Sequence, residues 1–149
     1  MKIAIASDHA GLELKTELQR VLGEKGHQAR DFGTHSGDSV DYPDFASQVA
    51  RAVQKGECEL GVLVCGTGVG MSIVANKYRG VRAALCHSEF EAKMARMHND
   101  ANVLCLGQRV TGPGLAAGVL EAFLEAKFEG GRHERRVQKV RDAESENQR

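Results

Sequence analysis

The stretch Leu60–Gly70, LGVLVCGTGVG, decides the fold. Its apolar start is typical of a buried β-strand, and this strand ends at Cys65. Three alternating glycines then predict a tight loop that leads into a helix, namely Gly66, Gly68 and Gly70. Backbone N–H groups point outward at such a junction and the helix dipole favours negative charge, so a thiol there is well placed to become a thiolate. We therefore expect a nucleophile or base beside a cradle for an anion.

The rest of the chain alternates strand-like and helix-like patterns. Short apolar runs predict strands at Lys2–Ala6, Leu60–Val64, Arg82–Cys86 and Asn102–Leu106, and a weaker strand pattern lies at Gln28–Phe32. Apolar residues at helical spacing predict helices at Leu12–Leu22, Phe45–Val53, Met71–Asn76, Ser88–Met97 and Pro113–Ala126. Ser88 and Glu91 have the spacing of a capping box, and Gly23 and Gly26 are expected to close the first helix. Because strands joined through helices imply right-handed crossovers, we predict an α/β fold, a parallel sheet with helices on both faces.

The C-terminal segment differs in kind from the rest of the chain. From Arg132 to Arg149 it holds six basic and four acidic residues, and Val137 and Val140 are its only sizeable apolar side chains. We expect a basic helix and tail there, over about residues 130–149, solvated and frayed at its end.

Length and composition bound the class of protein. At 149 residues the chain is most simply one domain, and its 42% hydrophobic and 27% charged residues are ordinary for a globular protein. Twenty basic residues balance twenty acidic ones, which argues against a chain that coats nucleic acid or an anionic membrane. Two tyrosines, five phenylalanines and no tryptophan argue against a base-stacking platform.

Targeting and redox features favour the cytoplasm. Polar Ser7, Asp8 and His9 end the N-terminal apolar stretch too early for a signal peptide. No run approaches the roughly 20 apolar residues of a membrane span. Four cysteines without a CxxC pair fit a reducing compartment better than a disulfide framework.

The carboxyl ends of parallel strands are where such sheets bind their ligands. Here those ends carry Ser7–His9, Cys65–Thr67, Cys86–His87 and Gly107–Arg109, so most polar candidates lie on one rim. The glycine loop is not a dinucleotide fingerprint, because Met71 stands where the last glycine is needed, and it lacks the Gly-Lys-Ser/Thr of a P-loop. Anion binding and plain tight packing remain even alternatives for this loop.

Each candidate side chain has a purely structural alternative. Cys65 is either a catalytic thiol or an inert core residue. Asp8 either reaches a substrate or only caps the first helix, and His9 either reaches a substrate or only makes a nearby hydrogen bond. His98 and Asn99, near a helix end, either transfer protons and orient a ligand or only suit the helix dipole.

Arg132 and Arg136 are four residues apart, so on a helix they share one face and could grip one phosphate. Solvated charge and salt bridges between subunits are the alternatives. No metal site is predicted, because His9, His98 and His133 lie far apart in sequence and no HxxxH or CxxC unit frames them.

Taken together, these motifs resemble the ribose-5-phosphate isomerase B family of sugar-phosphate isomerases (RpiB/LacA/LacB). The matching stretches run from Ile5 to Val137 in the family's order: IASDHAG, DYPDFA, CGTGVGMSIVANK, HNDANVLCLGQR and GGRHERRV. The resemblance implies a Rossmann-like three-layer α/β/α sandwich around a five-stranded parallel sheet, with no nucleotide cofactor and no metal. It also implies interconversion of an aldose phosphate and a ketose phosphate by homodimers, often paired into tetramers, with each site built from two subunits.

The resemblance also implies roles for individual residues. On that pattern Cys65 is the base that moves a proton between C1 and C2 through a cis-enediolate, Thr67 assists at the developing charge, and His98 opens the furanose ring. Loop amides hold the enediolate oxygens, from Gly66, Gly68, Val69 and Gly70. The sugar and its phosphate are bound by a set shared between two subunits: Asp8, His9, Tyr42, Asn99, Arg109, Arg132 and Arg136.

Another branch of the family carries a catalytic carboxylate in the following helix, whereas this sequence has Cys65 and, in that helix, Ala75. We therefore predict a cofactor-independent isomerase of ribose 5-phosphate and ribulose 5-phosphate. The nearest alternative is the same chemistry on a six-carbon phosphate, such as allose or galactose 6-phosphate. A non-catalytic sugar-phosphate sensor would not need Cys65 or His98, and a thiol redox protein would need the CxxC pair that is missing.

Overall fold

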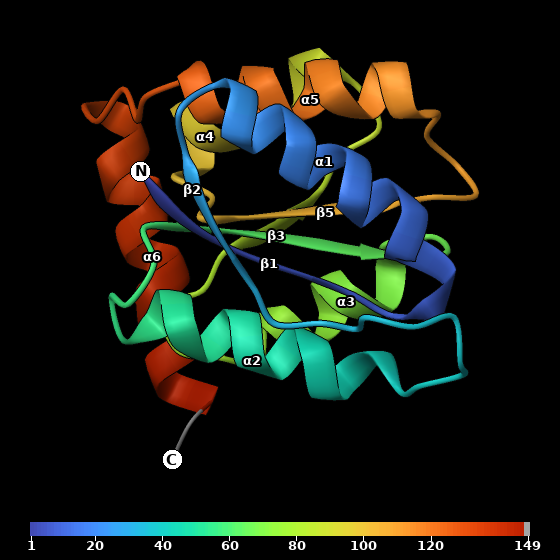
Figure 1. Cartoon of the computed structure of the whole chain (residues 1–149). Coiled ribbons are helices and arrows are strands. Elements are labelled where there is room, and N and C mark those ends of the chain that lie inside the picture. Colours follow the sequence, from blue (N-terminus) through green and yellow to red (C-terminus); the bar gives the residue numbers. More distant parts are fainter. Residues whose placement is uncertain (148–149) are drawn as a thin grey trace.

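A five-stranded parallel sheet lies between two layers of helices in the computed structural model of the chain, which describes residues 1–147 (Figure 1). Across the sheet the strands follow the order β2 (Gln28–Asp31), β1 (Lys2–Ser7), β3 (Leu60–Cys65), β5 (Val103–Gly107) and β4 (Ala83–Leu85). Every pair of neighbouring strands is parallel. This is the predicted Rossmann-like α/β/α fold, and all five predicted strands are present.

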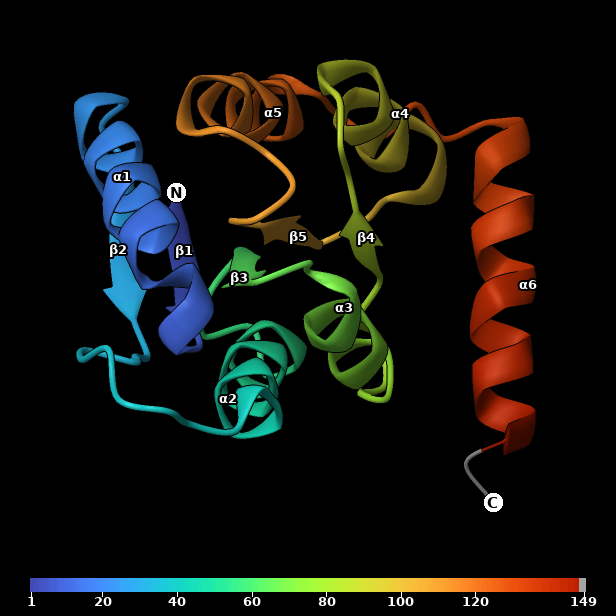
Figure 2. The same ribbon diagram turned by 90° about the vertical axis from the view of Figure 1, so that its right-hand side faces the viewer.

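Helices cover both faces of the sheet. One face carries α1 (Leu12–Glu24), α4 (Glu89–Asn99) and α5 (Pro113–Glu125), and the other carries α2 (Tyr42–Gln54) and α3 (Val69–Ala75) (Figure 1). A single 3-10 turn, η1 (His9–Gly11), links β1 to α1. The last helix, α6 (Arg132–Asn147), stands beside the β4 edge of the sheet instead of on a face (Figure 2).

Two apolar cores, one on each face, hold these layers together. Leu18, Leu104 and Phe123 are fully buried between the sheet and the layer of α1, α4 and α5. Leu63 and Met71 are fully buried on the side of α2 and α3. Burying one such side chain stabilises the fold by about 1.5–3 kcal/mol. The two cores therefore hold the strands in place and fix the positions of the loops that follow them.

Several element ends differ from the sequence prediction. The helix α2 begins at Tyr42 instead of Phe45, because Pro43 is tolerated in a first helical turn. The helix α4 continues past Met97 to Asn99 and ends where Asp100 adopts a left-handed backbone. Gly23 lies inside α1, so this glycine does not end the helix, and the left-handed Gly26 follows it. The predicted C-terminal helix is confirmed as α6, although its His133 and Val137 are buried.

The predicted cap at the start of α4 is confirmed. The Ser88 hydroxyl accepts a hydrogen bond from the amide of Glu91 at 3.2 Å, and the Glu91 carboxylate accepts one from the amide of His87 at 2.7 Å. The first bond satisfies an amide that the first turn of α4 leaves unpaired, and the second holds the residue before the N-cap. The predicted first-turn position of Pro113 in α5 is also confirmed.

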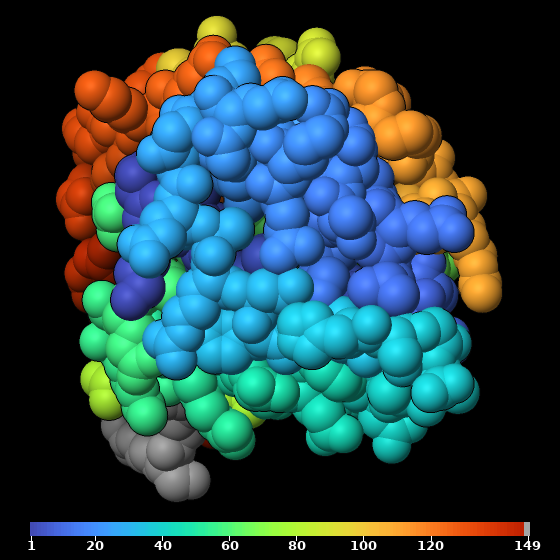
Figure 3. All heavy atoms as spheres, viewed as in Figure 1, coloured from blue at the N-terminus to red at the C-terminus, as the bar shows by residue number. Residues whose placement is uncertain are grey.

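A buried ion pair ties the β2 edge to α1. Lys15 is 1% exposed, and its Nζ donates to both carboxylate oxygens of Asp31, at 2.9 and 3.0 Å, and to the carbonyl of Thr34. This pair fixes the start of the segment that runs from β2 to α2. In the space-filling view, α1, β2 and that segment form one continuous surface over this edge of the sheet (Figure 3).

None of the helices in residues 1–147 is both long and apolar enough to span a membrane.

Candidate active site

Cys65 ends the central strand β3 and is 5% exposed. The amide of Gly68 donates a hydrogen bond to its Sγ at 3.0 Å. Gly68 can aim this amide because it adopts a left-handed backbone, φ 79°, as the N-cap of α3. This hydrogen bond fixes the sulfur against the glycine loop, at the carboxyl end of the central strand.

The glycines of this loop leave no space for side chains. A Cβ on Gly68 would lie 2.6 Å from Leu85 Cδ1 and 2.9 Å from the carbonyl carbon of Leu106. A Cβ on Gly70 would lie 2.6 Å from the ring of Tyr42. Tight packing, one of the two alternatives for the loop, is therefore observed, and anion binding by its amides stays a prediction.

The remaining loop residues differ in exposure: Gly66 is buried, whereas Thr67 and Val69 are exposed. A Cβ on Gly66 would lie 3.3 Å from Nη1 of Arg109, so the guanidinium rests against the loop. Thr67 is exposed, and its hydroxyl accepts a hydrogen bond from the amide of Val69 at 3.3 Å. The structure thus gathers these predicted residues with Cys65 at one end of β3.

Asp8 and His9 lie at the same rim. The amide of Asp8 donates to the carbonyl of Val64 at 3.2 Å, next to Cys65. The Asp8 carboxylate caps η1, because its Oδ1 accepts hydrogen bonds from two of the turn's amides at 3.0 and 3.1 Å. His9 Nδ1 accepts a hydrogen bond from the amide of Val40 at 3.2 Å. The structural roles considered for both residues are present, and their positions leave a binding role open.

The other three cysteines are free, buried thiols in apolar surroundings. Burial raises the pKa of Cys58. Burial, together with the charge of Glu91, raises the pKa of Cys86 to about 11. Burial and the neighbouring thiols raise the pKa of Cys105 as well. These thiols therefore stay protonated at neutral pH, and we expect none of them to act as a base.

A second group of predicted residues lies elsewhere. His98 and Asn99 occupy the last turn of α4, and Arg132 and Arg136 occupy the first turns of α6. Three of the four line a groove of about 590 Å³ between α4 and α6, namely His98, Asn99 and Arg136. Both arginines are exposed, as an anion-binding role requires.

Sequence reasoning missed two members of this second group. His133 lines the same groove and stacks on His98, with ring centroids 4.2 Å apart. Glu129 Oε2 lies 3.3 Å from His133 Nε2 and 3.8 Å from His98 Nε2. The separation of His98 and His133 in sequence, which argued against a cluster of ligands, is therefore misleading. Glu129 lies in the linker between α5 and α6, so no helical spacing in the sequence indicated its contact with the two histidines.

The two groups lie at opposite ends of the strands: the first at their carboxyl ends and the second near their amino ends. Cys65 pairs with Gly107 at the carboxyl end, whereas Gly61, at the amino end of β3, donates its amide to the carbonyl of Asn102 at 2.9 Å. Asn102 follows His98 by one tight turn after α4. Four residues of strand span about 13 Å. One chain therefore does not bring His98 to Cys65.

Comparisons with known proteins agree with this fold. Residues 3–140 match the model of the family described as Ribose/Galactose Isomerase. The chain is 50% identical to ribose-5-phosphate isomerase B of Escherichia coli (strain K12), with 93% of each chain covered.

Two solved structures superpose on nearly the whole chain. A ribose-5-phosphate isomerase B from Clostridium thermocellum has a TM-score of 0.97 and 51% identity, and the match covers 98% of this chain and 99% of that one. A ribose-5-phosphate isomerase B from Mycoplasma genitalium, with bound ribulose-5-phosphate, has a TM-score of 0.94 and 47% identity, covering 98% and 97% of the two chains.

Proposed function

Because the chain belongs to the Ribose/Galactose Isomerase family, we propose that it interconverts ribose 5-phosphate and ribulose 5-phosphate. The observation that carries the proposal is the hydrogen bond from the Gly68 amide to Cys65 Sγ. It joins a basic atom to a loop of N–H donors at the carboxyl end of the central strand. Aldose–ketose isomerisation needs this combination.

The reaction moves a proton between two adjacent carbons. A proton beside a carbonyl is only weakly acidic, so a base and donors to the developing oxyanion must act together. In our proposal Cys65 takes the proton from C2 of the aldose and returns it to C1, through a cis-enediolate. Thr67 and the amides of Gly66, Gly68, Val69 and Gly70 stabilise the enediolate oxygens.

Ring opening and binding use the second group of residues. His98 transfers the proton that opens the furanose ring, and Asp8 contacts the sugar. Asn99, Arg109 and Tyr42 complete the pocket. The phosphate is held by His9, Arg132 and Arg136. A phosphate bound away from the reacting carbons supplies positioning energy, and none of these steps requires a metal or another cofactor.

A second copy of the chain is part of this proposal. His98 lies near the amino ends of the strands, with the arginines beside it, whereas Cys65 lies at the carboxyl end of β3. Both groups therefore serve one substrate only when a partner chain supplies one of them. A two-fold symmetric homodimer provides two such shared sites, because each chain gives both groups. Pairing of two dimers into a tetramer is compatible with the same arrangement.

The compartment follows from the thiols. Four free cysteines within one small chain suit the reducing cytoplasm, where we propose that the protein acts on its sugar phosphate.

A six-carbon sugar phosphate is the second candidate substrate, because pocket depth depends on the partner chain. The test is a coupled assay on ribose 5-phosphate and allose 6-phosphate, with EDTA present, for the wild type and Cys65→Ala. We expect rapid turnover of the pentose that is insensitive to EDTA and lost in the variant. Turnover of allose 6-phosphate alone would change the assigned substrate to a six-carbon phosphate and leave the proposed mechanism standing. A Cys65→Ala protein with full turnover would refute the mechanism, and binding without turnover in the wild type would favour a sensor.

A further inference from the structure

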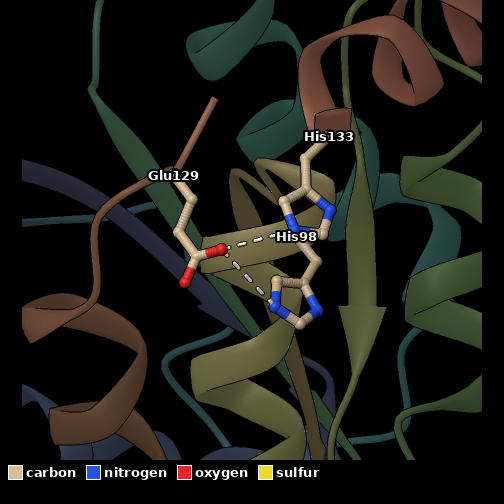
Figure 4. A group of neighbouring side chains, drawn as sticks. All are labelled: His98, Glu129 and His133. Atoms are coloured by element: carbon tan, nitrogen blue, oxygen red, sulfur yellow. Dashed lines mark ion pairs between the residues drawn. The ribbon is translucent and has the colours of Figure 1, made fainter. Parts of the chain in front are cut away.

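Three side chains that could bind a cation meet within the second group of residues. His98 comes from the last turn of α4, Glu129 from the linker after α5, and His133 from the first turn of α6 (Figure 4). One ligand atom of each lies within 4.8 Å of the other two. The Glu129 carboxylate faces the Nε2 atoms of both imidazoles (Figure 4).

The distances from Glu129 Oε2 to the two imidazoles are close to the spacing in a tetrahedral metal site, and all three ligand atoms lie within 4.8 Å of one another. Zinc bonds of about 2.0–2.1 Å place neighbouring ligand atoms about 3.3 Å apart. Glu129 Oε2 already lies 3.3 Å from His133 Nε2. It lies 3.8 Å from His98 Nε2, so that imidazole must approach by a few tenths of an ångström.

The two histidines differ in their freedom to make this adjustment. Their rings are nearly parallel, with an interplanar angle of 7°, so their lone pairs run side by side instead of converging. The His133 side chain is 6% exposed, whereas that of His98 is 37% exposed. Closing the site therefore requires His98, the more exposed imidazole, to rotate so that its Nε2 lone pair points toward Glu129 Oε2.

Backbone hydrogen bonds hold the three segments in place. The amide of Glu129 donates to the carbonyl of Met97 at 3.0 Å, next to His98, and the amide of His133 donates to the carbonyl of Gly130 at 3.0 Å. Gly130 and Gly131 both have left-handed backbones, with φ 66° and 56°, and turn the chain from the linker into α6. The arrangement is thus built by the fold and not by loose surface chains.

We propose that His98, Glu129 and His133 bind one divalent transition-metal ion of the zinc type, with a fourth position open to water. Two imidazoles and one carboxylate are a set that zinc accepts when one position stays open. The ion occupies Nε2 of His98, the residue to which we assign ring opening, so it acts as a reversible inhibitor. The exposed Arg132 and Arg136 nearby oppose a cation, and we expect a site that fills and empties instead of a permanent structural one.

Metal binding itself is the first readout, and it does not depend on the proposed enzymatic function. Full-length protein freed of metal with EDTA is titrated with Zn²⁺ by calorimetry and with Co²⁺ by visible absorption, which reports tetrahedral coordination. Glu129→Gln changes an exposed ligand with little risk to folding, and His133→Asn changes the buried one. His35→Ala removes an exposed histidine elsewhere, and Cys65→Ala removes the thiol most able to bind zinc by itself.

The expected result is one ion per chain, with a dissociation constant that rises at least about tenfold in Glu129→Gln and in His133→Asn. It stays unchanged in His35→Ala and in Cys65→Ala. Three results would overturn the proposal: no binding to the wild type, equal affinity in Glu129→Gln, or loss of binding in Cys65→Ala, which would place zinc on the thiol.

Inhibition is the second readout, and this part rests on the proposed function. Added Zn²⁺ is expected to slow the isomerase, EDTA to restore it, and Glu129→Gln to need about tenfold more Zn²⁺ for the same inhibition. Binding by the wild type without any inhibition would contradict the assigned effect on His98 and leave the metal site standing. Absence of isomerase activity without metal would instead refute the proposed function.

Discussion

Replacing Gly68 by alanine tests the link between the loop and the thiol. Gly68 adopts φ 79°, and a left-handed backbone costs a residue with a Cβ about 1–2 kcal/mol. The new Cβ would lie 2.6 Å from Leu85 Cδ1, which can move, and 2.9 Å from the backbone of Leu106, which cannot. Overpacking of this kind costs about 1–3 kcal/mol, so Gly68→Ala is expected to lower the free energy of unfolding by about 2–5 kcal/mol.

The same substitution is expected to slow catalysis. The clash pushes the Gly68 amide away from Cys65 Sγ, to which it donates at 3.0 Å. A hydrogen bond to a charged group contributes about 1.5–3 kcal/mol. At about 1.4 kcal/mol for each factor of ten, kcat/KM on ribose 5-phosphate should fall about 10- to 100-fold.

Gly56→Ala is the matched control. Gly56 has φ 70°, but nothing lies within 4 Å of the Cβ that alanine would add. We expect Gly56→Ala to lower the free energy of unfolding by about 1–2 kcal/mol and to keep wild-type activity. Thermal unfolding and the coupled isomerase assay measure both quantities. The reasoning is refuted if Gly68→Ala is folded, no less stable than Gly56→Ala, and as active as the wild type.

Three further predictions concern the buried ion pair, the thiols and a helix cap. Burial opposes ionisation of Asp31, but hydrogen bonds, led by the one from Lys15, outweigh burial and lower the pKa of this carboxyl. The ionised carboxylate therefore stabilises the fold above the ordinary aspartate pKa of about 3.9, and this stabilisation is lost as the pH falls through the lowered pKa. Lys15→Met should cost about 3 kcal/mol at pH 7 and weaken this acid dependence in urea unfolding; an unchanged profile would contradict the assignment. Iodoacetamide at pH 8 should modify Cys65 first and abolish turnover, whereas early modification of Cys86, whose pKa burial raises to about 11, would contradict the assignment of the reactive thiol. Ser88→Ala should lose about 1 kcal/mol in thermal unfolding with kcat/KM unchanged, because its hydroxyl only caps α4.

Local patterns in the sequence were sufficient to predict the fold. Apolar runs bounded by glycines and polar residues located four of the strands, β2 had only a weaker pattern, and the return of each strand through a helix indicated a parallel sheet. The ends of helices were less predictable, because they depend on the backbone conformation of single residues, which the residue type allows but does not determine. Asp100, which ends α4 in a left-handed conformation, is an example.

The candidate site was predictable only in part. The rim around Cys65 follows from strand order, since Asp8, Cys65 and Arg109 all follow parallel strands. The position of His98 also follows from topology, because a helix after a parallel strand returns the chain to the amino edge. Glu129 was not predictable from motifs, because its contact with both histidines depends on how two left-handed glycines turn the chain into α6.

The most direct test of shared active sites is subunit complementation. Cys65→Ala and His98→Ala proteins are prepared separately, mixed, unfolded and refolded together, and assayed on ribose 5-phosphate. In a random mixture about half the dimers are mixed, and each mixed dimer holds one site with both residues intact, so we predict recovery of about a quarter of wild-type activity. If the mixture shows no more activity than the two variants apart, each site lies within one chain, and the proposal that two chains share each active site is wrong.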